Sequence, residues 1–301
     1  EILIGLVGSE MCIRDRLDTL EKRMLYYRGL TDYKLLPNAP VILMLDGRAF
    51  SKFCKRFTKP YDEKFIGMMN ETAQYLCENI EGCKFAYVQS DEISLYVTDT
   101  ENENSESWFG YRLVKMLSIA ASLATAKFNQ LLTIERLNNG LSSISDLKNE
   151  KLIEFDCKVW NVPTLNDVFA WFLYRQIDCI RNSKQMAAQT YIPHEELTGL
   201  HTDQQIAKLK ELKGIDWFEY SDDKKFGRFI YKERITVPYE IPEKFKNGRI
   251  PDKMLNNLIT EDTDDGTFYY IQRNKWIAHN GFELTSDEGK QQFYNILGWQ
   301  Q

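Results

Sequence analysis

Four short β-prone segments and two segments of helical period alternate in one order between residues 41 and 160, and this order constrains the fold more than any other feature. The four segments are rich in β-branched and aromatic residues, which is typical of strands. The predicted strands are residues 41–46, 84–89, 93–97 and 155–160. The resulting order, β-α-β-β-α-β, predicts a ferredoxin-like α+β domain with a four-stranded sheet against two helices.

The two predicted helices of this unit carry apolar residues three or four positions apart, which is the spacing of one buried face. Asp62 opens the first helix, and Gly82 ends it. The second helix runs from residue 109 to residue 131, before the loop at residues 138–140.

The remainder of the chain has a different pattern. A long helix follows Pro163 and reaches about residue 191, weaker helical patterns cover residues 194–212, and residues 226–237 and 267–276 resemble a paired β-ribbon. We therefore expect a sheet domain at residues 17–163 and a helical and β-ribbon region at residues 164–301. Residues 1–16 lack an initiating Met, and we expect a non-native leader there.

Composition excludes several classes of protein. A net charge of −6 and a pI near 5.4 argue against indiscriminate nucleic-acid binding, although a local basic patch can still bind phosphate. No apolar run approaches the roughly 20 residues that a membrane span needs. The 6 cysteines include no CxxC pair, so the sequence predicts neither a zinc ribbon nor a disulfide framework, and a reducing, cytoplasmic location fits.

Asp46 ends the first predicted strand, and Asp91 lies at the tip of the hairpin between the second and third strands, with Glu92 beside it. The first and third strands of a split β-α-β-β-α-β sheet are neighbours, so these carboxylates can meet. Adjacent carboxylates repel each other unless a cation neutralises them, and oxygen ligands suit Mg²⁺. Asp46, Asp91 and Glu92 are therefore candidate catalytic residues of a two-metal site. The alternative is that the aspartates only cap strands and start turns.

A basic segment follows Asp46. Gly47 permits a tight turn, and the amides after it could form a concave nest for a triphosphate. Lysine and arginine residues alternate with phenylalanines up to Lys59. The same alternation is expected of a half-buried edge whose basic side is solvated.

The long helix after Pro163 carries polar residues three or four positions apart, among them Arg175, Asp178 and Asn182, followed by Gln185 and Gln189. A solvated surface gives the same pattern. Side chains that form bidentate hydrogen bonds on a rigid helix also suit an RNA end or a nucleobase.

At these residues the sequence resembles the tRNA(His) guanylyltransferase family, especially its bacterial and phage members, which polymerise in the 3′-to-5′ direction. The resemblance extends from about residue 17 to residue 232. The segments that carry it are Leu45-Asp46-Gly47-Arg48-Ala49-Phe50, Lys59-Pro60-Tyr61-Asp62-Glu63, Ala86-Tyr87-Val88-Gln89-Ser90-Asp91-Glu92-Ile93-Ser94, Arg175-Gln176-Ile177-Asp178, Arg181-Asn182-Ser183 and Leu197-Thr198-Gly199.

The resemblance implies a palm-like fold, as in polymerases and nucleotide cyclases, and addition of nucleotides to the 5′ end of tRNA by a homotetramer. It implies two Mg²⁺ ions held by Asp46, the Gly47 carbonyl and Asp91. It assigns Arg175, Asp178 and Asn182 to a second nucleotide or to the tRNA end. The residues that it assigns to the nucleoside triphosphate, GTP or ATP, are Asp46, Gly47, Arg48, Ala49, Phe50, Ser51, Lys59, Asp62, Ser90 and Asp91.

Two departures from the family pattern bear on the substrate. Met44 stands where the family commonly has Arg, and the segment around Asn182 lacks the His of the eukaryotic His-Ile-Asn-Asn run. The missing His favours repair of 5′-truncated tRNAs over recognition of tRNA(His). The alternatives are a nucleotide or diguanylate cyclase, which shares the palm and the paired acids, and an inactive palm that only binds RNA.

Overall fold

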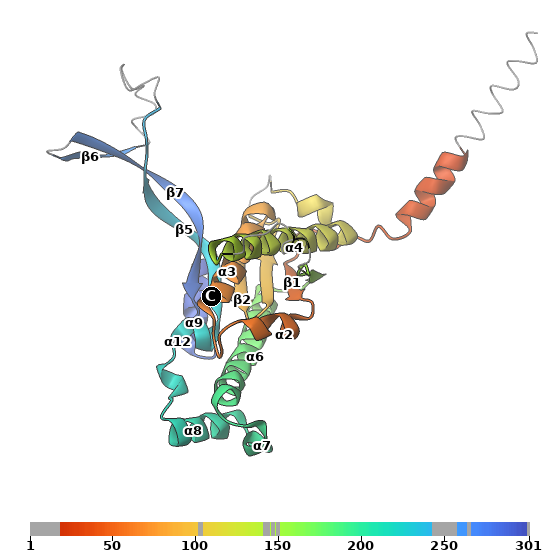
Figure 1. The fold of residues 1–301 in the computed structure, drawn as a ribbon. Helices are drawn as coiled ribbons and strands as arrows, with labels where there is room; N and C mark the ends of the chain where they lie inside the picture. The colour runs from red at the N-terminus through yellow and green to blue at the C-terminus, as the bar shows by residue number, and fades with distance from the viewer. Residues whose placement is uncertain are drawn as a thin grey trace, which may run out of the picture.

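The computed structural model describes residues 19–101, 105–140, 145, 148, 151–242, 258–263 and 266–299. The predicted leader at residues 1–16 lies outside these ranges. In the described part of the chain, one antiparallel sheet of seven strands has the order β4-β1-β3-β2-β5-β7-β6 (Figure 1). The strands are β1 (Val41–Gly47), β2 (Cys83–Gln89), β3 (Glu92–Val97), β4 (Phe155–Asn161), β5 (Arg228–Pro238), β6 (Ile259–Thr263) and β7 (Gly266–Asn280).

The order β4-β1-β3-β2 confirms the predicted ferredoxin-like arrangement, with β1 and β3 side by side at its centre. The predicted size of the sheet was wrong, because β5 pairs with the outer edge of β2 and carries β7 and β6 with it. Ala86 lies opposite Ile230 in this pairing. Local hydrophobic patterns cannot reveal a pairing between strands so far apart in the chain.

Helices α3 (Glu63–Asn79) and α4 (Leu113–Asn138) cover one face of the sheet. Val41, Leu43 and Leu45 alternate along β1 and belong to the core that these helices form. The second predicted helix begins later than expected. A short 3₁₀ segment, Trp108–Tyr111, precedes it, because Phe109 has a φ of 54° and Gly110 a φ of 59°, which no α-helix accommodates.

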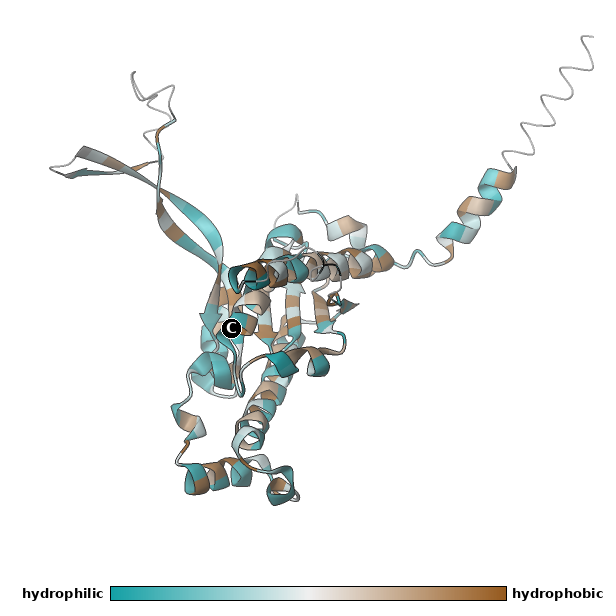
Figure 2. Ribbon diagram, in the orientation of Figure 1, coloured by the Kyte–Doolittle hydropathy of each residue, from teal (hydrophilic) through white to brown (hydrophobic). Residues whose placement is uncertain are grey.

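Helices α6 (Leu165–Tyr191) and α12 (Asp287–Leu297) contribute to the core on the other face. Ile42 on β1 and Tyr96 on β3 point into this second core, where they join Phe172 and Phe293. The central strands therefore carry buried apolar residues on both faces. Figure 2 shows hydrophobic residues along these strands as brown bands. Burial on both faces leaves the ends of the strands as the places where polar side chains gather.

The far end of α6 carries a small lobe, made of α7 (His194–Leu197) and α8 (Thr202–Lys213), with its own apolar cluster. The short helix α9 (Asp222–Phe226) packs against α6 and β7 in the body. The β5–β7 ribbon leaves the body in another direction and ends at β6 (Figure 1). This ribbon confirms the predicted pairing of the two C-terminal strands. Within the described ranges, no helix combines the length and the apolar character that crossing a bilayer requires.

Candidate active site

Acidic residues from three adjacent strands meet where β1 ends. Asp46 lies directly opposite Glu92 on β3 and opposite Asp156 on β4. Residues paired in this way point to the same face of an antiparallel sheet. The predicted approach of the first and third strands therefore brings Asp46 and Glu92 to the face that α6 covers.

Asp91 lies in the two-residue turn that joins β2 to β3, just beyond the paired residues Gln89 and Glu92. Its backbone carbonyl accepts a hydrogen bond from the Gly47 amide at 3.2 Å, which joins the turn to the end of β1. Ser90 has a φ of 47°, and its hydroxyl donates to Asp91 Oδ1 at 2.9 Å. The turn thus orients the Asp91 carboxylate next to the last residues of β1.

The two aspartates share an electrostatic environment that disfavours their charged forms. Asp46 is exposed as a residue, but partial burial still raises the pKa of its carboxyl group, and the charge of Asp156 adds to the effect, while Lys158 and Arg175 oppose it. Burial also raises the pKa of Asp91, and the charge of Asp46 raises it further. Both carboxylates are therefore close enough to a like charge to benefit from a bound cation.

This pair of carboxylates fits Mg²⁺ by its chemistry, because it offers hard oxygen ligands. In the described residues, no three metal-binding side chains form a cluster. An ion at Asp46 and Asp91 would take its other ligands from the backbone, water and substrate. Mg²⁺ is commonly held in this way, by one or two carboxylates together with phosphate oxygens.

Glu92, the third candidate catalytic residue, is already engaged. The residue is 6% exposed, and its carboxylate accepts hydrogen bonds from Arg175 Nε at 2.7 Å and from Arg175 Nη2. Trp171 and Tyr174 lie under the same guanidinium. Glu92 is therefore a buried partner of α6, while Asp46 remains exposed.

Arg175 connects the acids to the polar face of α6. Its Nη2 also contacts Asp178 Oδ2 at 3.2 Å, and Asp178 in turn accepts hydrogen bonds from Arg181 and from Asn182. The three residues predicted to bind a second nucleotide or the tRNA end thus form one network. In this structure, the guanidinium of Arg175 is hydrogen-bonded to Glu92, whereas Asn182 lines a cavity.

The segment after β1 turns as predicted, but two of its amides are occupied. A Cβ atom on Gly47 would lie 2.2 Å from the Phe50 ring, so this position requires glycine. The Gly47 amide donates to Asp91, and the Arg48 amide donates to the Glu154 carbonyl at 2.9 Å. Only the amides further along remain for the predicted triphosphate nest.

The side chains of this segment divide into two classes. Phe50 and Phe53 are buried in the core with Phe128 and Phe155, while Arg48 is exposed and pairs with Glu154 at 2.8 Å. The alternation of basic and phenylalanine residues had two interpretations, a triphosphate nest or a half-buried edge. The buried phenylalanines agree with the half-buried edge. Ala49 and Ser51 complete the segment, and Ala49 has a φ of 60°.

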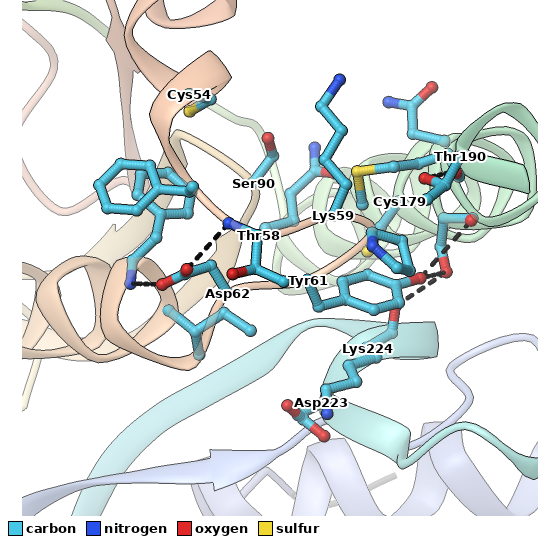
Figure 3. A pocket seen from close by; sticks show the side chains of 18 of the residues that line it. Cys54, Thr58, Lys59, Tyr61, Asp62, Ser90, Cys179, Thr190, Asp223 and Lys224 are labelled. Carbon is cyan, nitrogen blue, oxygen red and sulfur yellow. Dashed lines mark hydrogen bonds between the residues drawn. The ribbon is translucent and has the colours of Figure 1, made fainter.

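A cavity of about 490 Å³ opens beside the acids, between the loop before α3, the second half of α6 and α9. Figure 3 shows Tyr61 in its middle, between Asp62 and Thr190. Four residues that the sequence predicted for nucleotide or tRNA binding line this cavity: Lys59, Asp62, Ser90 and Asn182. Ser90 links the cavity to Asp91 through its hydroxyl.

Asp62 is held by backbone amides. Its side chain accepts hydrogen bonds from the amides of Thr58, Lys64 and Phe65 at 3.0 to 3.1 Å, which caps α3 and closes the preceding loop. Burial acts to raise its pKa, but these amides prevail and lower it. Asp62 therefore contributes to the cavity in two ways: it lines the wall, and it fixes the loop at Thr58 that forms part of the same wall.

Several residues of the site were not predicted from the sequence. Asp156 faces Asp46 only because of the β4 register. Tyr61 and Ser183 lie in segments that carry the family resemblance but were assigned no role, and they contact each other across the cavity, with Tyr61 Oη 2.6 Å from Ser183 Oγ. Cys54, Lys224 and Arg228 also line the cavity. A single residue of each type, without a repeated spacing, gives no pattern that could have identified it.

A sequence model of the tRNAHis guanylyltransferase family matches residues 22–163. A bacterial tRNA(His) guanylyltransferase-like protein in complex with ATP is 34% identical, with a TM-score of 0.64 over 70% of this chain and 88% of its own. A bacterial protein of the same description, in complex with GTP, is 27% identical, with a TM-score of 0.67 over 93% of this chain and 99% of its own. The tRNA(His) guanylyltransferase of Debaryomyces hansenii is 27% identical over 66% of this chain and 76% of its own.

Proposed function

The chain belongs to the tRNA(His) guanylyltransferase family, and from this premise we propose that it is a nucleotidyltransferase that adds nucleotides to the 5′ end of tRNA in the 3′-to-5′ direction. The departures in its sequence favour template-dependent repair of 5′-truncated tRNA. Its substrates are tRNA, GTP and the other nucleoside triphosphates, with ATP to activate a 5′-monophosphate.

One observation carries this proposal: Asp46 and Asp91, far apart in the sequence, meet at the ends of adjacent strands, and the charge of Asp46 raises the pKa of Asp91. A purely structural pair of acids gains nothing from this repulsion. A site that binds a divalent cation does, because the cation offsets the repulsion when it binds.

We assign two Mg²⁺ ions to Asp46, the Gly47 carbonyl and Asp91. When bound, they would lower the pKa of the attacking 3′-hydroxyl and neutralise the departing pyrophosphate. The protein supplies the rest by orientation. The turn at Ser90 holds the Asp91 carboxylate, and Arg175 holds the Glu92 carboxylate.

The cavity next to Ser90 provides the binding site for the base and ribose of a nucleotide. Its walls contain amide, hydroxyl and charged side chains beside apolar ones, as nucleotide sites do. Lys59 extends from the loop on one side, and Asn182 faces the cavity from α6 on the other. A nucleotide bound here has its phosphates directed toward Ser90 and Asp91.

Residues 17–163 form the palm-like catalytic part, and residues 164–301 bind tRNA and form the contacts of a homotetramer. The exposed Phe268 on β7 supports such contacts. In the described part of the chain, five cysteines are free, which supports a reducing, cytoplasmic environment.

The test is an end-extension assay with intact and 5′-truncated tRNA, each labelled nucleoside triphosphate, and either Mg²⁺ or a chelator. We expect Mg²⁺-dependent addition to the truncated tRNA. We expect no addition by Asp46→Ala or Asp91→Ala, with unchanged far-UV circular dichroism. Glu71→Ala is the matched control, because Glu71 is an exposed carboxylate on α3.

The same assay separates the rival functions. A cyclase would form a cyclic nucleotide from labelled GTP without any tRNA. An inactive palm would bind tRNA with an affinity that falls with salt but would incorporate nothing. Near-normal extension by either aspartate variant would refute the two-metal assignment.

A further inference from the structure

Arg228, the first residue of β5, is the most buried cation in the wall of the cavity. It is 6% exposed, and its Nε donates to Asn70 Oδ1 on α3 at 3.0 Å. Its Nη2 atom is buried and has no hydrogen-bond partner in the described part of the chain. A buried donor of a charged group that is left unpaired is costly, so its presence requires an explanation, and a bound ligand that accepts from it is one.

The neighbouring carboxylates leave this cation without a dedicated partner. Asp223 and Glu63 act on it through their charges, but burial has the larger effect and lowers the pKa of Arg228. Glu63 is itself paired with Lys224 at 2.7 Å. Figure 3 shows Asp223 and Lys224 together on the α9 side of Tyr61, at the edge of the same cavity.

The chemistry of the cavity wall distinguishes Arg228 from its polar neighbours. Asn182, Gln185 and Gln189 carry amides, which both donate and accept hydrogen bonds and so adapt to any base. A guanidinium only donates, through a planar fork. It matches a base edge with two adjacent acceptors, which guanine presents at O6 and N7, whereas adenine presents a donor at N6.

We propose that Arg228 is a specificity-determining residue of the cavity, whose guanidinium donates to the O6 and N7 atoms of a bound guanine. This inference rests on the proposed function, because it assumes that the cavity holds the base of a nucleoside triphosphate. It adds a preference for guanine over adenine at this site. This preference comes from Arg228, which lies at the start of β5 and outside the segments that resemble the family motifs.

The experiment measures equilibrium binding to the full-length chain in the presence of Mg²⁺. The probes are GTP, ITP, ATP and inorganic tripolyphosphate. ITP carries the O6 and N7 acceptors of guanine without its 2-amino group, and tripolyphosphate carries no base. The proteins are the wild type, Arg228→Gln, Arg228→Lys and the control Arg273→Gln, which changes an exposed arginine on β7.

The wild type should bind GTP and ITP more tightly than ATP. Arg228→Gln should weaken GTP and ITP by about 5- to 150-fold, the range that one bidentate contact to a base supplies. Tripolyphosphate should change by less than about threefold, and the control should behave as the wild type. ATP should bind as well as before or more tightly, because a glutamine amide can pair with N6 and N7 of adenine. Arg228→Lys should also lose the preference, because an ammonium keeps the charge but not the fork.

Other results overturn the inference. An equal loss for GTP, ATP and tripolyphosphate would mean that Arg228 binds phosphate. An unchanged ratio of GTP to ATP affinity, together with a lower melting temperature, would mean that its role is structural. If the wild type extends tRNA but binds GTP no more tightly than ATP, only this inference fails. If it binds no nucleoside triphosphate, the proposed function fails as well.

Discussion

Arg175 on α6 and Glu92 on β3 form a buried bidentate pair, with Arg175 Nε 2.7 Å from Glu92 Oε1. The pair joins the helix to the strand directly beside Asp46 and Asp91. In this pair, the Glu92 carboxylate, which the sequence suggested as a third catalytic acid, is bound to Arg175. Its role is to hold α6 against the end of the sheet where the cavity and the acids meet.

Breaking this pair should destabilise the fold severely. Arg175→Met should lower the free energy of unfolding by about 3–5 kcal/mol, because it leaves the Glu92 charge buried without a partner. The double variant Arg175→Met/Glu92→Gln should lose clearly less. Denaturant unfolding of the wild type, the single variants and the double variant measures this. Additive losses would show that the two side chains do not act as a pair.

Removing a charge from the aspartate pair should stabilise the metal-free protein. Burial and neighbouring charges raise the pKa of both Asp46 and Asp91, so their ionised forms oppose folding at neutral pH. Asp91→Asn should therefore raise the melting temperature at pH 7 by about 1–3 °C while it removes activity. Asn keeps the Oδ1 acceptor that the Ser90 hydroxyl uses.

The same pKa shifts predict a pH dependence. A carboxyl whose pKa is raised on folding binds its proton more tightly in the folded state, so the penalty from Asp91 should disappear as the pH falls through its folded pKa. The stabilisation by Asp91→Asn should shrink over that window in thermal melts without metal. A gain that is constant down to pH 4 would contradict the assignment.

Gly47→Ala should destabilise the protein by about 1–3 kcal/mol, the usual cost of forcing a group into a packed core. The new Cβ would lie 2.2 Å from the Phe50 ring, which is 2% exposed and cannot move freely. The same substitution in a Phe50→Leu background should cost less. An equal cost in both backgrounds, measured by denaturant unfolding, would show that the clash with Phe50 is not the cause.

Asp62→Ala should lower the free energy of unfolding by about 1–2 kcal/mol, because it removes the cap of α3. It should also raise KM for the nucleotide, because Thr58 and the loop that lines the cavity lose their anchor. Thr164→Ala removes a comparable cap, from α6, outside the cavity. It should lower stability without changing KM. Equal changes of KM in both variants would refute the role of the loop.

The order of strands and helices in residues 41–160 determined the ferredoxin-like core. Strands repeat about every 2 residues and helices about every 3.6, and elements in the order β-α-β-β-α-β have few ways to bury their apolar faces. The same order indicated that Asp46 and Asp91 converge. Asp46 lies at the end of the first strand and Asp91 in the turn before the third, and this topology makes the first and third strands neighbours. Capping by Asp62 was visible in the same way, as a local signal before an apolar helix face. These features depend on periodicity and local backbone preference, which one sequence contains.

The tertiary structure alone decided the rest. It paired β5 with β2 and thereby brought Arg228 to the cavity, it set the β4 register that places Asp156 opposite Asp46, and it buried Arg175 against Glu92. Each of these relationships joins segments that are distant in the chain. Residue spacing within one segment carries no information about such contacts, because they depend on which surfaces remain free once the sheet has formed.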